Sequence, residues 1–236
     1  MSCKESLSLH GPSSRSSTPA TQPRSTRRSP FSFSQIIDDD HMAINTYAGR
    51  LKNATTVARR RELLFQVLWR LVRHDVSEDI VMRPAFMTHL GDLGRTMAET
   101  DRSDHDRAKA ELLALLQVPI DSDQFMREID RLFNELLEHM RVESGQEIPQ
   151  LESVLSKEES HRLGRLYLQT QVITPDLVVR GPDGVPRRLF EDVEDYARTD
   201  LSTFKAIWDR LPPETWSDNG ATETTSVKKR DKGSRL

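Results

Sequence analysis

The sequence predicts an all-α fold: an up-down-up-down four-helix bundle with additional C-terminal helices. Three observations predict it. Apolar residues recur three and four positions apart in four successive segments, which is the spacing of one face of a helix. The connections between these segments are short enough to make consecutive helices antiparallel. A short sequence motif also occurs twice: Glu follows His by four residues, and Pro follows that Glu by six.

The first two helices are expected over residues 34–53 and 56–81. Proline removes a backbone donor and crowds the preceding turn, so Pro84 is expected to end the second helix. The following segment contains Gly91 and Gly94, and we expect it to be a loop.

The third helix is expected to begin near Ser103, a suitable N-terminal cap, and to end near residue 117. The fourth should run from about residue 121 to just before Pro149, which repeats the proline signal of the second helix. Its apolar residues again recur at three and four positions, so one face should be buried.

The C-terminal third contains further helical signals. A fifth helix is expected over residues 157–170. Residues 174–188 are rich in Pro and Gly and predict a loop, with a small hairpin around Pro182-Asp183-Gly184. Residues 189–211 are expected to be helical.

Composition divides the chain into four parts. Residues 1–33 form a Ser/Pro/Arg-rich tail without periodicity, which is typical of disorder, and residues 218–236 form a second polar tail. The bundle with its fifth helix is expected over 34–170, followed by a loop and helical extension over 171–217. The two tails are basic and the net charge is −3, so the middle of the chain is acidic. That balance argues against a nucleic-acid-binding domain, and no apolar run approaches the roughly 20 residues of a membrane span.

Four histidines are predicted to meet at one level of the bundle. In an up-down-up-down topology, the start of the first helix, the end of the second, the start of the third and the end of the fourth share one end. One histidine lies at each of these places, on the apolar stripe: His41, His74, His105 and His139. Residues four apart share a helix face, so Glu78 and Glu143 should point the same way as His74 and His139.

Burying so many ionisable groups would cost several kcal/mol without a partner, so the pattern predicts a metal site. Imidazoles mixed with carboxylates suit iron better than calcium or magnesium, which prefer oxygen ligands. Zinc usually takes four ligands and would leave this set overfilled. Two ions that share carboxylates would use all six side chains.

The order of these residues resembles the hemerythrin-like, or HHE cation-binding, family over about residues 34–170. The resemblance rests on His41, His74-x3-Glu78, His105 and His139-x3-Glu143. It implies a four-helix bundle with a non-haem di-iron centre, in which two iron ions carry an oxo or hydroxo bridge. The two glutamates would then bridge the irons and the four histidines would be terminal ligands.

Two departures from the oxygen-carrying members of the family concern the ligand set. Those members have a second histidine one turn after the position of His105, where this chain has Lys109. Glu143 also follows His139 by four residues and not by five. The resemblance therefore implies a six-residue variant with an open position. Lys109 could donate to a ligand bound there, or its ammonium could extend past the bundle into solvent.

Two further acidic residues have open assignments. Asp40 could orient His41 by accepting a hydrogen bond, or it could serve only the start of its helix. Glu147, eight residues after His139, lies near the same helix face and could support the site or lie at the surface.

Two functions fit such a site. The first is a non-catalytic protein that binds iron and a small ligand, dioxygen or nitric oxide. The alternative is a di-iron oxidase or peroxide-handling enzyme that acts on an organic substrate. A helical scaffold without metal is a third class.

The last three residues, Ser234, Arg235 and Leu236, resemble the peroxisomal C-terminal address Ser-Lys-Leu. They predict recognition by a peroxisomal import receptor, and the alternative location is the cytoplasm.

A fluorescent reporter that ends in this tail should concentrate in peroxisomes, and removal of Leu236 should make it diffuse. A reporter that is diffuse with and without Leu236 would refute the address.

Overall fold

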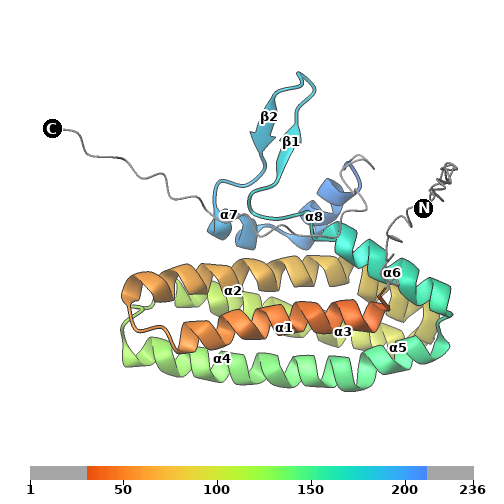
Figure 1. The fold of residues 1–236 in the computed structure, drawn as a ribbon, viewed down its shortest axis with the longest axis horizontal. Helices are drawn as coiled ribbons and strands as arrows, with labels where there is room; N and C mark the ends of the chain where they lie inside the picture. The colour runs from red at the N-terminus through yellow and green to blue at the C-terminus, as the bar shows by residue number, and fades with distance from the viewer. Residues whose placement is uncertain (1–30, 212–236) are drawn as a thin grey trace, which may run out of the picture. The chain divides into compact units, whose positions relative to one another are not determined.

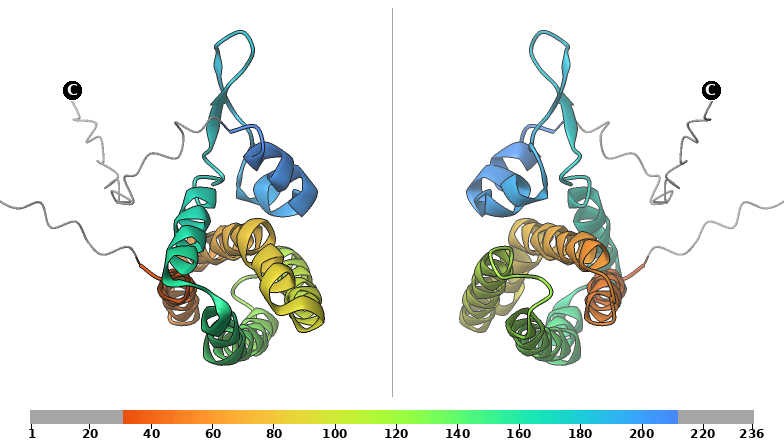
Figure 2. Two further views of the ribbon diagram at one scale, coloured as in Figure 1. Left: turned by 90° about the vertical axis from the view of Figure 1, so that its right-hand side faces the viewer. Right: turned by 90° about the vertical axis from the view of Figure 1, so that its left-hand side faces the viewer.

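The computed structural model describes residues 31–211, and four long helices form a bundle within it (Figures 1 and 2). The prediction of an all-α bundle is confirmed. These helices are α1 (Phe33–Lys52), α2 (Val57–Ser77), α3 (Arg83–Leu115) and α4 (Asp123–Val142). A hydroxyl side chain caps the start of three of them: Ser32, Thr56 and Ser122 each accept a hydrogen bond from a backbone N–H of the first turn.

Two π-helical turns begin at the glutamates of the repeated motif. They are η1 (Glu78–Met82) and η2 (Glu143–Glu147). The expectation that Pro84 and Pro149 end their helices is wrong. Each proline instead lies in the first turn of the helix that follows its π turn, where a missing N–H costs little. After η2, this helix is α5 (Ile148–Val154).

The expected loop after Pro84 is also helical, because the chain turns within a single residue. The backbone of α3 leaves the helical region only at Gly91, with φ 60° and ψ −128°, a conformation that glycine adopts without steric cost. Gly94 then packs so closely that an added Cβ would lie 1.9 Å from the carbonyl oxygen of Phe86. The third helix therefore extends well before Ser103, which is not its cap.

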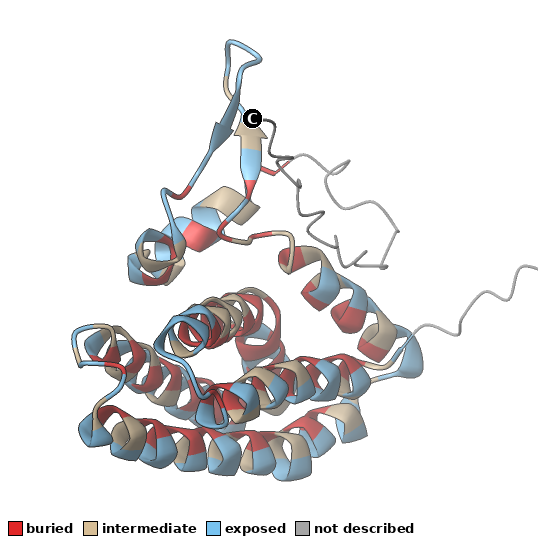
Figure 3. Cartoon of the chain, turned by 60° about the vertical axis from the view of Figure 1, so that its left-hand side comes forward, coloured by how far each residue is buried: buried red, intermediate tan, exposed pale blue. Residues whose placement is uncertain are grey.

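The apolar core consists of two clusters with polar residues between them along the bundle. One cluster includes Leu71 and Leu112, and the other includes Ile37, Phe86 and Leu151. Figure 3 shows the buried positions along the inner faces of the helices. Following each helix from one cluster to the other, the chain passes through buried His and acidic side chains, which form a polar layer.

The C-terminal segment adds a fifth long helix, a hairpin and two short helices, which can be followed in Figure 1. The expected helix over 157–170 is confirmed as α6 (Lys157–Thr170), which packs on α1. The hairpin is confirmed too: β1 (Val178–Arg180) pairs antiparallel with β2 (Pro186–Arg188). Residues 189–211 form two short helices, α7 (Val193–Arg198) and α8 (Leu201–Trp208), instead of one.

The two short helices are joined through Asp200, whose extended backbone interrupts the expected helix. The rings of Phe190, Tyr196 and Phe204 stack edge-on or tilted against one another and anchor this segment beside α2. None of the described helices is long and apolar enough to cross a membrane. Ser234, Arg235 and Leu236 lie outside the described residues, so the peroxisomal address stays a prediction.

Candidate metal centre

The structure brings together all six side chains that the sequence predicts as metal ligands. The imidazole rings follow one another around the bundle axis: the ring centroids are 4.9 Å apart for His41 and His74, 5.3 Å for His74 and His105, and 4.9 Å for His105 and His139. Each ring comes from a different helix of the bundle. The two glutamates come from the π turns η1 and η2, which begin one helical turn after their histidines.

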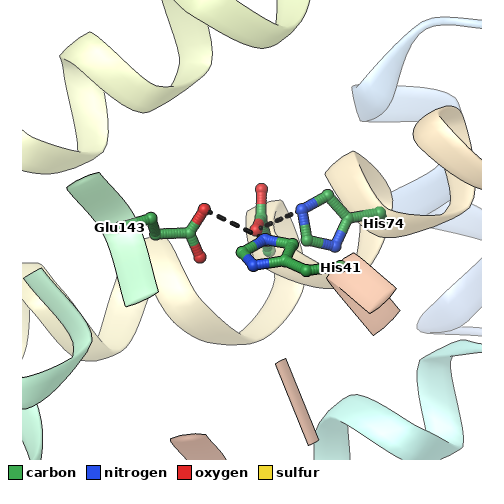
Figure 4. A group of neighbouring side chains, drawn as sticks. His41, His74 and Glu143 are labelled. Carbon is green, nitrogen blue, oxygen red and sulfur yellow. Dashed lines mark ion pairs between the residues drawn. The ribbon is translucent and has the colours of Figure 1, made fainter. Parts of the chain in front are cut away.

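Four of these side chains form a first group of donors: His41, His74, Glu78 and Glu143. One ligand atom from each lies within 4.8 Å of all the others. Nε2 of His74 is 2.8 Å from Oε1 of Glu78, and Nε2 of His41 is 3.4 Å from Oε2 of Glu143. Figure 4 shows His41 and His74 facing Glu143 across the interior of the bundle.

A second group shares Glu143 with the first and consists of Asp101, His105, His139 and Glu143. Nε2 of His139 is 3.5 Å from Oε2 of Glu143. Glu78 also reaches this side, because its Oε2 is 3.1 Å from Nε2 of His105. Both glutamates therefore lie between the two groups, where a bridging carboxylate would lie.

Asp101 is the donor that the sequence analysis missed. Its Oδ1 is 3.4 Å from Nε2 of both His105 and His139. The third helix does supply a second donor one turn away from His105, but on the side of its N-terminus. Lys109, one turn on the other side, is half-buried. Placing residue 101 in a loop hid the four-residue spacing between Asp101 and His105 that would have revealed the pair.

The donor atoms themselves show that the site fits a metal. Seven of the atoms that point into the centre are buried and make no hydrogen bond: both carboxylate oxygens of Glu78 and of Glu143, Nε2 of His41 and of His74, and Oδ1 of Asp101. Nε2 of His105 and Nε2 of His139 are 3.1 Å from each other. A buried polar group without a partner costs about 1–3 kcal/mol, and more if it is charged. The protein orders several such groups at one place, and coordination to metal cations would satisfy them.

The charge of the polar layer also indicates a site for metal cations. Five carboxylates are buried among residues 31–211, and all lie in or beside the centre: Asp40, Asp75, Glu78, Asp101 and Glu143. The guanidinium groups that pair with them belong to Arg73 and Arg83. The two guanidinium charges therefore leave three carboxylates to be balanced, by protonated histidines in the metal-free protein or by metal cations in the loaded one. Burial and the charge of Asp101 raise the pKa of both glutamates, which is the response of carboxyls that need a cation.

A hydrogen-bonded chain from outside the bundle fixes the orientation of His74. Its Nδ1 is 2.7 Å from the hydroxyl of Tyr167 on α6, and this hydroxyl donates to Oδ2 of Asp40 at 3.1 Å. Arg73 holds the other oxygen of Asp40 at 2.7 Å. Nδ1 can then carry the proton and donate it, which leaves Nε2 free to bind a metal.

Both assignments considered for Asp40 are wrong. Asp40 is buried in the middle of α1, far from the helix start, and it contacts His74 and not His41. The neighbour of His41 is Ser144, whose Oγ is 3.0 Å from Nδ1 of that ring.

Arg83 holds Asp101 of the second donor group in place. It is fully buried, and its Nε donates to Oδ2 of Asp101 at 2.6 Å while Nη2 donates to Oδ1 of Asp75 at 2.7 Å. Although burial opposes the charge, these carboxylates raise the pKa of Arg83 above its usual value. The charged guanidinium holds one oxygen of Asp101 and turns the other toward His105 and His139.

The histidines respond differently to their surroundings. Burial lowers the pKa of His41 to about 3, so this ring is neutral at pH 7. Burial also acts on His139, but the carboxylate of Asp101, with Oδ1 3.4 Å from Nε2, and the charge of Glu143 outweigh it and raise the pKa to about 9. In the metal-free protein, His139 is therefore protonated at neutral pH.

A helical bundle with a buried layer of His and carboxylate side chains defines a class of metal-binding proteins. Comparison with known proteins agrees, because the sequence model of the Hemerythrin HHE cation binding domain matches residues 32–151. The chain belongs to the hemerythrin HHE family of cation-binding proteins. An uncharacterized hemerythrin-like protein of Schizosaccharomyces pombe is 32% identical over 143 residues, which are 61% of this chain and 70% of the relative.

A solved structure supports the fold. The crystal structure of a hemerythrin HHE cation binding domain-containing protein from Mycobacterium kansasii superposes with a TM-score of 0.53 at 19% identity. The alignment covers 60% of this chain and 85% of the other. At this identity the likeness concerns the arrangement of helices, so the assignment of individual donors rests on the geometry above.

Replacing Tyr167 by Phe tests the support of His74. The variant Tyr167→Phe removes the oxygen that accepts from Nδ1, and the metal affinity should fall by about tenfold. Competition with a chelator measures this. Tyr196→Phe is the matched control, because that buried hydroxyl donates to the carbonyl of Ile173 away from the centre. Equal affinity losses in both variants would contradict the role of Tyr167.

The pKa of His139 predicts a pH-dependent affinity. A metal binds neutral imidazole, so binding should release the proton of His139 at any pH below about 9. The apparent affinity should rise about tenfold per pH unit from pH 7 toward 9 because of this group. His41, neutral above about pH 3, should release no proton in that range.

Chelator competition, corrected for the protonation of the chelator, checks this dependence. A flat affinity between pH 7 and 9 would contradict it.

The stability of the metal-free fold should show the reverse dependence on pH. The stabilisation linked to His139 is fully present below the ordinary pKa of 6.5 and is lost as the pH rises through about 9.

Proposed function

We propose that this chain holds two iron ions in the buried layer and that the dinuclear centre binds dioxygen or a related small ligand such as nitric oxide. The observation that carries the proposal is the pair of donor groups that share Glu143, with Glu78 placed between His74 and His105. Each group combines imidazole nitrogen with carboxylate oxygen, a set that suits iron.

The seven donor side chains would divide between the ions. His41 and His74 would bind the first, and Asp101, His105 and His139 would bind the second, with Glu78 and Glu143 between them. When bound, two irons supply redox chemistry toward dioxygen. The chain's own contribution is to exclude water with the two apolar clusters and to hold each donor through a fixed partner, as Arg83 holds Asp101.

The alternative, a di-iron oxidase or peroxide-handling enzyme, needs space for an organic substrate beside the donors. A cavity of about 460 Å³ does reach Asp101 and His139, but five of the residues that line it are acidic and Val142 is its only aliphatic one. Such a lining does not favour an apolar substrate. We therefore prefer the binding of a small ligand.

Metal stoichiometry tests this function. The full-length chain, reconstituted with ferrous iron under nitrogen, should hold two irons per chain and gain visible absorption in air. Glu143→Ala should lose both irons because the two groups share this residue, whereas His41→Ala should retain one. His89→Ala is the control, since His89 is exposed and absent from both groups.

Iron content and an optical spectrum of each variant give the answer. Wild-type protein with well under one iron per chain, at a level that Glu143→Ala does not change, would refute the proposal. Two irons without any spectral response to air would retain the metal site and refute the binding of dioxygen.

A further inference from the structure

A cavity between α3 and α4 connects the surface with the second donor group. Its volume is about 460 Å³, and it is lined at one end by Asp101 and His139. These are members of the donor group described above, and the donors that belong only to the first group, His41 and His74, do not line it. Among the described residues, the cavity is thus an opening onto one side of the centre.

The lining of this cavity is strongly acidic. Five of its side chains carry carboxylates, and the basic residues among them are Arg107 and His139. The carboxylates belong to Asp101, Asp104, Glu135, Glu138 and Glu147. Toward the rim, arginines pair with three of them: Arg107 with Asp104, Arg131 with Glu135 and Arg141 with Glu138. Such pairs between exposed side chains are weak and leave the carboxylates accessible to a stronger cation.

Glu147 lacks such a partner. It is half-buried, and no ion pair within residues 31–211 involves it. Burial, together with the charges of Glu143 and Asp101, raises the pKa of Glu147 to about 7. The side chain thus experiences the negative field of the centre, which a passing cation would relieve.

At the inner end, a buried oxygen faces the same space. Asp101 is 2% exposed, and its Oδ1 has no hydrogen-bond partner. Arg83 binds the opposite oxygen, so Oδ1 is held in position toward His139. Nε2 of His105 and of His139 are its nearest donor atoms, each 3.4 Å away, and both belong to the same donor group. A fixed carboxylate oxygen that makes no hydrogen bond at the end of an acidic cavity is a ligand for a cation and not for an anion or an apolar molecule.

We propose that this cavity is the route by which divalent metal cations reach the centre, with Glu147 as a transit ligand and with Asp101 and His139 as the first permanent ligands that they meet. The inference rests on the proposed metal-binding function. Acidic walls raise the local concentration of cations and speed their association. Oxygen ligands along the route replace the water of a hydrated ion stepwise.

The rate of metal uptake tests the route separately from the metal site. Metal-free, full-length protein is mixed with Co²⁺ in a stopped-flow instrument, and absorption follows incorporation. Glu147→Gln should slow uptake about tenfold, which lies within the range of electrostatic steering, and Glu147→Lys should slow it further. The final stoichiometry should match that of the wild type, because Glu147 is not a member of either donor group.

Glu158→Gln is the matched control. It makes the same carboxylate-to-amide change at an exposed position on α6, away from the cavity, and should leave the rate unchanged. Circular dichroism checks that every variant is folded. Full loading of Glu147→Gln and Glu147→Lys at the wild-type rate would overturn the route alone. A wild-type chain that takes up no metal would overturn the proposed function and the route with it.

Discussion

The cost of burying charge in the middle of the bundle governs the rest of this structure. The seven side chains of the two donor groups that share Glu143 converge there, between two apolar clusters that exclude water. Without cations, several of their atoms lack any hydrogen bond. The surrounding fold can be understood as the support that keeps these groups in place: Arg83 and Arg73 offset part of the charge, and Tyr167 fixes a tautomer.

The repeated motif gives the centre its approximate symmetry. In each copy a histidine precedes a glutamate by one helical turn, and the glutamate opens a π turn. A π turn widens the helix locally and commonly occurs at functional sites. Here both turns place carboxylates between the two donor groups, and the prolines that follow them start new helical segments without breaking the path of the chain.

Much of this could be predicted from the sequence, because periodicity and short connections determine both the buried face and the level of each histidine. The convergence of His41, His74, His105 and His139 follows from those two facts alone. Asp101 could not be found in this way. Proline and glycine signals between Pro84 and Gly94 predicted a loop, whereas the chain turns at Gly91 and is helical on both sides. A loop at this place leaves residue 101 outside every expected helix face.

The partners of each donor were harder to predict than the donors. Asp40 and Arg73 come from α1 and α2, and Tyr167 comes from a helix outside the four of the bundle. No spacing in the sequence relates positions that meet only after α6 packs on α1. Long-range hydrogen bonds of this kind depend on tertiary packing, which periodicity does not describe.

The position of Tyr167 has a consequence for how this domain should be delimited. The family match ends at residue 151, yet the hydroxyl that orients His74 lies 16 residues further on, in α6. A protein trimmed to the matched segment would keep all seven donors and lose the phenol behind one of them. It would also uncover the cluster around Ile37, which α6 covers with Leu163 and Tyr167. The segment that holds the donors together with the support of His74 therefore extends from α1 through α6.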